Sequence, residues 1–175
     1  MDSVILAGDL VLRLWTTADR AAVYDIIAAS RTEFDSWLPR LVSDIEDFDI
    51  FVDRVVRAAR DGQSWSYGVE ADGTIVGQCS LHVKDNDSAE IGYWIRTDRA
   101  KEGITTRAIQ ALCNAAVDHG FATLFIHCDE GNAASAAVAR KLGFTHVSTA
   151  DLDPSLPGTS IQTGREMTWT ITLAN

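Results

Sequence analysis

The chain has 175 residues, of which 46% are hydrophobic and 23% are charged, an ordinary balance for a globular protein with a core. Its formal net charge of −10 disfavours a general nucleic-acid binder. The charge would suit a cationic acceptor, or it has no role beyond keeping the protein in solution. No apolar run approaches the roughly 20 residues of a membrane span, and the start lacks the parts of a signal peptide. We therefore expect one cytoplasmic domain over residues 1–175.

The first elements in chain order are a strand and two helices. Residues 10–15 alternate as a strand does, and the capping residues after them precede apolar positions at helical spacing from 22 to 27. Residues 33–41 are expected to be irregular, because a proline interrupts them. A second apolar helical stripe, from 48 to 59, ends at Gly62 as a helix C-cap.

Three strand-like runs follow, at residues 64–70, 74–82 and 89–96. The first two are joined by "ADG", which predicts a tight hairpin. The third leads into a helix that begins near Ile104 and runs out near Gly120.

The last elements are a compact buried strand at 123–128 and a helix with Asn132 as its N-cap and Gly143 as its stop. A short strand at 145–149 and an alternating strand at 165–173 complete the chain. Antiparallel hairpins come first and a β-α-β crossover lies in the middle. This order predicts a mixed α/β sheet and not a doubly wound parallel one.

The cysteines Cys79, Cys113 and Cys128 are odd in number and form no C-x-x-C pair. Neither a disulfide framework nor a structural zinc site is indicated, and we expect three small buried hydrophobes. The sequence also offers no other cluster of metal ligands, so no metal is expected.

The stretch "RTDRAKEGITTR", residues 96–107, joins the third of those strands to its helix and is rich in basic residues. Backbone amides at such a helix start favour an anion, and Gly103 lets a phosphate approach the backbone closely. Asp98 and Glu102 reduce the positive charge. The loop has neither G-x-G-x-x-G nor G-K-[ST], and a single glycine at this type of turn also occurs for structural reasons alone.

Three segments together resemble the GNAT N-acetyltransferases of the RimJ/RimL type. They are "LVLRLWTTAD" with "WLP" downstream, "EIGYWIRTDRAKEGITTRAIQAL", and "GNAASAAVARKLGF" after a buried strand. The resemblance spans about Leu10 to Phe144, in the family's order of elements. It implies a central, mostly antiparallel mixed sheet that is splayed between its fourth and fifth strands, with helices on both faces.

The resemblance also implies that the cofactor is acetyl-CoA. The family's loop reads Q/R-x-x-G-x-G/A. Ala100 stands at its first position and Thr105 at its last, and both depart from the pattern. The neighbouring Arg99 is a candidate substitute. Three groups of residues are implied in cofactor binding. They are the backbone of Trp94, Ile95 and Arg96 for the pantetheine, the amides of Lys101, Glu102, Gly103, Ile104, Thr105 and Thr106 for the diphosphate, and Asn132 and Arg140 along the arm.

The family transfers acetyl groups by direct attack of an amine in a ternary complex, without an acyl-enzyme or a metal. Ser135 matches a serine that donates a proton to the thiol in RimL-like proteins, although a packing or capping serine is equally expected there. Glu90 is a candidate base or a solvent-facing strand residue. His127 is a candidate base or a core histidine, and Cys128 is not expected to act as a nucleophile.

Trp37 and Tyr93 are candidates for the substrate pocket, or else anchor the loop and the core. The acids at 44–49 either attract a cationic acceptor or form a solvated helix start. The resulting hypothesis is acetyl transfer to a primary amine, specifically the N-terminal α-amine of a protein or peptide, ribosomal proteins being the family's named examples. The alternatives are a small-molecule amine (antibiotic, polyamine or amino acid), a non-catalytic acyl-CoA-binding module, and an unrelated phosphate-binding α/β domain. A homodimer is a further expectation, because this branch often forms one.

Overall fold

The computed structural model describes residues 1–37, 48–152 and 162–173. The strands are β1 (Val4–Ala7), β2 (Leu10–Leu14), β3 (Ser64–Ala71), β4 (Thr74–Val83), β5 (Ser88–Ile95), β6 (Thr123–Asp129), β7 (Thr145–Asp151) and β8 (Arg165–Thr172). The helices are α1 (Arg20–Ala29), α2 (Arg31–Trp37), α4 (Phe48–Arg60), α5 (Ile104–Asp118) and α6 (Ala133–Lys141), with short 3-10 turns at Thr17–Asp19 and Thr97–Arg99.

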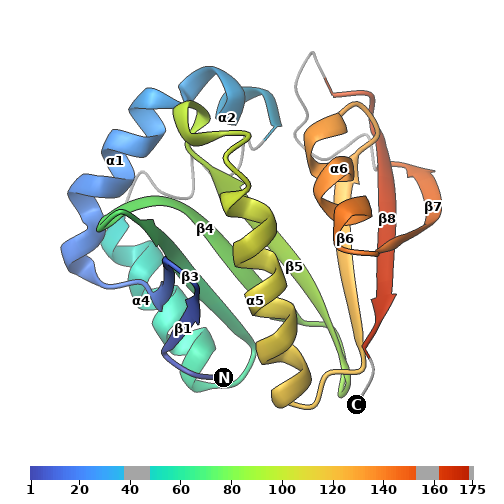
Figure 1. The fold of residues 1–175 in the computed structure, drawn as a ribbon, viewed down its shortest axis with the longest axis horizontal. Coiled ribbons are helices and arrows are strands. Elements are labelled where there is room, and N and C mark those ends of the chain that lie inside the picture. Colours follow the sequence, from blue (N-terminus) through green and yellow to red (C-terminus); the bar gives the residue numbers. More distant parts are fainter. Residues whose placement is uncertain (38–47, 153–161, 174–175) are drawn as a thin grey trace.

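The strands form one eight-stranded sheet in the order β1-β2-β3-β4-β5-β6-β8-β7. Every neighbouring pair is antiparallel except β5 and β6. These two central strands pair only at Ser88–Thr123, Ala89–Leu124 and Glu90–Phe125, and beyond that point they separate (Figure 1). The mixed, mostly antiparallel sheet and its splay are thus confirmed, with β5 and β6 being the fourth and fifth of the predicted strands.

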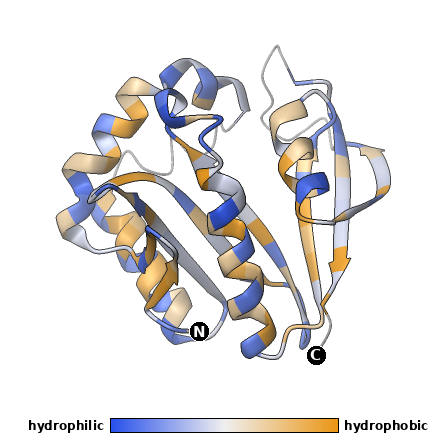
Figure 2. Ribbon diagram, viewed as in Figure 1, coloured by the Kyte–Doolittle hydropathy of each residue, from blue (hydrophilic) through white to orange (hydrophobic). Residues whose placement is uncertain are grey.

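Helices cover both faces of the sheet, and each face has its own apolar core. On one face, α5 and α6 contribute buried residues such as Ile109, Leu112 and Ala139. On the other, α1, α2 and α4 pack around Trp15 and Trp94, whose stacked rings are 6.4 Å apart. Figure 2 colours α4 and α5 in alternating hydrophobic and hydrophilic bands, as expected of helices that bury one side.

Two features of the N-terminal half differ from the prediction. Strand β1 was not predicted, because it is an edge strand of only four residues with no cross-strand neighbour on its outer side. Residues 33–37 were expected to be irregular but belong to α2, a short helix that buries Phe34 against the core. The proline in that segment lies outside the described residues.

Two local predictions, the tight hairpin and the buried cysteines, are confirmed. Asp72 and Gly73 both have positive φ, 53° and 74°, as a tight hairpin requires. The three cysteines are free and buried. In the described part of the chain, no helix is long and apolar enough to cross a membrane, and no group of three potential ligands is placed to hold a metal ion.

Candidate active site

A cleft of about 320 Å³ opens where β5 and β6 separate. Its walls are the end of α2, the free edge of β5, the end of β6 and the start of α6. It brings together eight residues that the sequence singled out: Trp37, Glu90, Tyr93, Trp94, Ile95, Thr105, Asn132 and Ser135. His127 and Cys128 also line it, as do Phe34, Asp129 and Gln162, which the sequence did not single out.

Among the described residues, β5 has no partner strand on its β6 side beyond Glu90, and the cleft lies along that edge. The amide of Arg96 donates to the carbonyl of Val76 on β4 at 2.8 Å. In an antiparallel ladder the hydrogen-bonding groups of successive residues point to opposite sides. The backbone groups of Tyr93 and Ile95 therefore face away from β4 and toward the cleft, whereas those of Trp94 and Arg96 face β4.

Two hydroxyl groups meet across the cleft. The hydroxyl of Tyr93 lies 2.8 Å from Ser135 Oγ, and it is 3.2 Å from the carbonyl oxygen of Ser135, to which it can donate. Burial raises the pKa of Tyr93 to about 12, so its hydroxyl stays protonated at neutral pH. The side chain of Asn132, as predicted, caps α6 by accepting the Ser135 amide at 3.1 Å. The cap is therefore Asn132, and the Ser135 hydroxyl remains directed at Tyr93.

Glu90 lies at the last residue pair before the strands separate. Its carboxylate accepts a hydrogen bond from Lys84 Nζ at 2.9 Å, and its side chain is 32% exposed. The same bond raises the pKa of Lys84. His127 Nδ1 is 3.4 Å from a carboxylate oxygen of Glu166 and 3.3 Å from Thr168 Oγ1. Glu90 and His127 both line the cleft, so each is within reach of a ligand there.

The turn before α5 has the backbone geometry of an anion site. Gly103 is the helix N-cap with φ of 77° and no side-chain cap, which leaves the first amides of α5 without intrahelical partners. Lys101 also has a positive φ, 70°, which is uncommon for a residue with a Cβ. Ser30, which is fully buried, accepts the amide of Thr97 at 2.9 Å and thereby fixes the turn against the α1–α2 corner.

The arginines of this turn are each held by an acid. Arg96 bonds to Asp98 at 2.6 Å, and Arg99 bonds to Glu102 at 2.9 Å and to Asp72 at 3.0 Å. The Arg96 guanidinium in turn lowers the pKa of Asp98. The charges of Arg96 and Arg99 are therefore compensated within the structure, whereas the first amides of α5 have no intrahelical partners.

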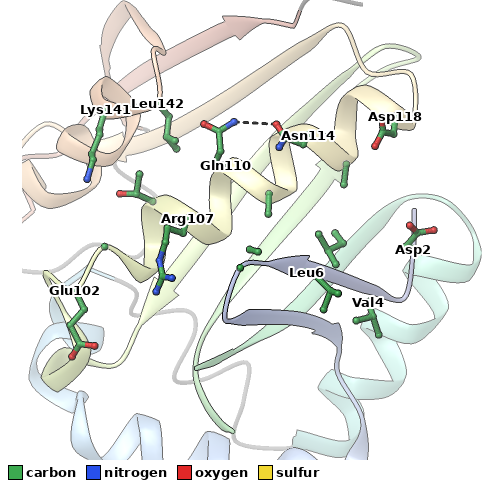
Figure 3. A pocket seen from close by; sticks show the side chains of 17 residues that line it. Asp2, Val4, Leu6, Glu102, Arg107, Gln110, Asn114, Asp118, Lys141 and Leu142 are labelled. Atoms are coloured by element: carbon green, nitrogen blue, oxygen red, sulfur yellow. Dashed lines mark hydrogen bonds between the residues drawn. The ribbon is translucent and has the colours of Figure 1, made fainter. Parts of the chain in front are cut away.

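A larger groove of about 890 Å³ begins at the same turn and runs between β1 and the outer face of α5 (Figure 3). Its lining includes Glu102, Gly103 and Thr106 at one end. Figure 3 shows Val4 and Leu6 on β1 and the polar side chains Arg107, Gln110, Asn114 and Asp118 along α5. Gln110 donates to Asn114 at 3.2 Å. The anion turn thus lies between the cleft and the groove. Arg140 lines neither, and its guanidinium lies 5.7 Å from the ring centre of Trp169.

Comparison with known proteins identifies this arrangement. The family described as "Acetyltransferase (GNAT) domain" matches residues 9–145, more than half of the chain. The chain belongs to the GNAT acetyltransferase family. It is also 28% identical over 142 residues to YdaF of Bacillus subtilis (strain 168), whose name assigns it to the ribosomal N-acetyltransferases, and the match covers 77% of each chain.

Solved structures show the same GNAT fold. The ribosomal L7/L12 α-N-protein acetyltransferase RimL in complex with coenzyme A superposes with a TM-score of 0.87 at 22% identity, covering 97% of this chain and 98% of that one. The microcin C7 self-immunity acetyltransferase MccE, in complex with acetyl-CoA and AMP, gives a TM-score of 0.86 at 23% identity, covering 99% and 98%. Membership of the family confirms the predicted enzyme class, an acyltransferase that uses acetyl-CoA.

Proposed function

We propose that this GNAT protein acts in the cytoplasm as one catalytic domain that acetylates the N-terminal α-amine of a protein or peptide. The observation that carries the proposal is the Tyr93–Ser135 hydroxyl pair in the cleft, beside the free edge of β5. The names of YdaF and RimL support the choice of a ribosomal protein as acceptor.

The cleft, the turn and the groove together suit a long ligand with an anion in its middle. Tyr93 and Ile95 offer unpaired backbone groups to the two amides of a pantetheine arm, and Trp94 and Arg96 hold that edge against β4. The amides from Lys101 to Thr106 suit the diphosphate. The groove beyond Gly103 then has room for the nucleotide, while Asn132 borders the arm on the other side.

Acetyl-CoA supplies an acetyl group activated as a thioester. The chain's residues have to place an amine against it, favour the amine's neutral form and protonate the departing sulfur. Ser135 Oγ–H is placed to give its proton to that sulfur, while the neutral Tyr93 hydroxyl donates a hydrogen bond to Ser135 Oγ, and water entering the cleft then returns a proton to Ser135. Glu90 is the carboxylate to accept the amine's proton, through a water at the mouth of the cleft. The amine attacks directly, so no acyl-enzyme forms.

The acceptor end of the cleft is aromatic and acidic. Phe34, Trp37 and Trp94 provide the aromatic side chains, and Glu33 and Glu90 provide carboxylates. Among the described residues, the cleft lining contains no lysine or arginine. An ammonium group entering from this side meets complementary charge, which favours an amine acceptor.

The test is thiol release from acetyl-CoA with a peptide that begins with a free serine, compared with the same peptide acetylated at its α-amine. Lysine and a polyamine serve as small acceptors. We expect turnover only with the free peptide. Tight coenzyme A binding without turnover on any amine would instead indicate a non-catalytic module.

Two variants test the hydroxyl pair. Ser135→Ala should lower kcat about a hundredfold at neutral pH, because a positioned proton donor contributes about 10²–10⁴-fold, and should leave the affinity for acetyl-CoA unchanged. Tyr93→Phe should lower kcat less, because Ser135 remains. Ser148→Ala, at an exposed position on β7, is the control and should behave as the unmodified protein. Full activity in Ser135→Ala would assign Ser135 to packing alone.

A further inference from the structure

Asp129 is a buried carboxylate that the mechanism above does not use. It is the last residue of β6, lines the cleft and is only 8% exposed. Among the described residues it forms no ion pair. A buried carboxylate without a cation needs hydrogen bonds to offset its lost hydration, and its contacts show where they come from.

All of the donors to this carboxylate are uncharged, and they come from two separate segments. The amide of Gly131 donates to Oδ1 at 2.7 Å. The amide of Thr163 donates to Oδ2 at 3.0 Å, and the hydroxyl of Thr163 lies 3.1 Å from Oδ1 and 3.2 Å from Oδ2. One carboxylate therefore joins the turn that starts α6 to the residues that lead into β8.

This junction of Asp129, Gly131 and Thr163 lies next to Trp37, which belongs to the acceptor end of the cleft and is called the acceptor wall below. A Cβ added at Gly131 would lie 3.1 Å from Asp129 Oδ1, 3.2 Å from the Thr163 methyl and 3.5 Å from the Trp37 ring. Gly131 therefore faces Asp129, Thr163 and the Trp37 ring, and a side chain at this position would crowd the first two. Gly131 thus places the turn next to Trp37 in the cleft.

The junction also fixes the start of α6. The carbonyl of Asp129 accepts the amide of Asn132 at 2.9 Å. Asn132 in turn caps the amide of Ser135 at 3.1 Å, and Ser135 Oγ meets Tyr93 at 2.8 Å. A continuous path of hydrogen bonds therefore leads from Asp129 through Asn132 to Ser135.

We propose that Asp129 is a positioning residue that sets Ser135 against the thioester and aligns it with the acceptor wall. The expected changes in kcat rest on the proposed function, whereas the expected changes in the local structure around Asp129 do not. Asp129 acts through Ser135, so removing its carboxylate should matter only while Ser135 is present. A carboxylate that served global stability alone would give effects independent of Ser135.

The first experiment is a double-mutant cycle in acetyl transfer to the free serine peptide. Asp129→Asn should lower kcat about ten- to a hundredfold, because a misplacement of about 1 Å can cost that much. In the Ser135→Ala background the same substitution should cost less than about twofold. Equal losses in both backgrounds would overturn the proposal. Asp61→Asn, which removes an exposed carboxylate paired with Arg60 at 3.3 Å, is the control and should change nothing.

A second pair of variants covers the case in which Asp129→Asn does not fold. Thr163→Val keeps the amide donor and removes the hydroxyl, whereas Thr163→Ser keeps both. We expect Thr163→Val to lose several-fold in kcat and Thr163→Ser to retain it. An unchanged kcat in Thr163→Val would overturn the proposal in its kinetic form.

A third readout does not require activity. Hydrogen exchange of the coenzyme A-bound protein, measured by mass spectrometry, should be faster at residues 130–136 and 162–166 in Thr163→Val and unchanged in α5. If the peptide is not acetylated at all, the proposed function fails while this measurement still decides about the junction. Unchanged exchange at both segments would refute the positioning role.

Discussion

Replacing Gly103 with alanine is the most direct test of the anion turn, because it separates backbone strain from ligand contact. Gly103 has φ of 77°, and a Cβ added there would meet no protein atom within 4 Å. The protein alone should therefore lose only the cost of a left-handed residue with a Cβ, about 1–2 kcal/mol. For a chain of this size, each kcal/mol corresponds to about 2–4 °C in Tm.

The effect on coenzyme A should be larger than the effect on folding. The space that the new methyl would occupy is the space in which the diphosphate is proposed to bind. Hydrogen bonds to charged groups contribute about 1.5–3 kcal/mol each, so losing one such amide–phosphate contact should raise Kd about ten- to a hundredfold. Titration calorimetry with coenzyme A at 25 °C measures this directly.

Gly62 provides the matched control. It has φ of 70°, nothing within 4 Å of an added Cβ, and lies just beyond the end of α4, away from the cleft and the groove. Gly62→Ala should lower Tm by the same few degrees and leave Kd unchanged. A Gly103→Ala protein that binds coenzyme A with the unmodified Kd would refute the assignment of the turn.

Two further predictions concern stability. Gly77→Ala would place a Cβ 2.4 Å from the Trp94 carbonyl oxygen, so β4 and β5 would have to separate. We expect urea unfolding to show a loss of more than about 2 kcal/mol in the free energy of unfolding. Gly73→Ala, with φ of 74° and open space around the added Cβ, is the control and should cost about 1 kcal/mol. Burial raises the pKa of Cys113 and of Tyr93 to about 12 each and also raises those of Tyr67 and Cys79. The unfolded chain therefore releases these protons at lower pH than the folded one, and folding becomes less favourable as the pH rises. The urea concentration at the unfolding midpoint should decrease as the pH is raised from about 8 to about 10.5, and a constant or rising midpoint would contradict this.

The features that the sequence predicted are mostly local ones. Asn132 as a cap and Gly103 at a helix start depend on neighbours within a few residues, and both are present in the structure. The order of strands and helices predicted the mixed sheet, because alternation and helical spacing extend over whole elements. Strand β1 and helix α2 escaped prediction because four and seven residues are too few for periodicity to show.

The contacts that shape the site depend on tertiary structure and could not be predicted in the same way. Tyr93 and Ser135 are 42 residues apart, and Asp129 and Thr163 are 34 apart. Nothing in either local sequence indicates its partner. A polar residue at the end of a buried strand was the only signal for Asp129, and many such residues merely begin a turn. Glu102 is a local partner of Arg99, but the second acid, Asp72, lies beside Arg99 only because the β3–β4 hairpin brings it there.

The shortness of the β5–β6 ladder has a chemical consequence. Only three residue pairs join β5 to β6, so among the described residues the remaining edge of β5 has backbone donors and acceptors without a partner strand. On the function we propose, the amide groups of the pantetheine arm complete that row of hydrogen bonds. The same proposal implies that the gap in the sheet selects acyl donors by the amides of their tail, so a thioester without such a tail should bind more weakly.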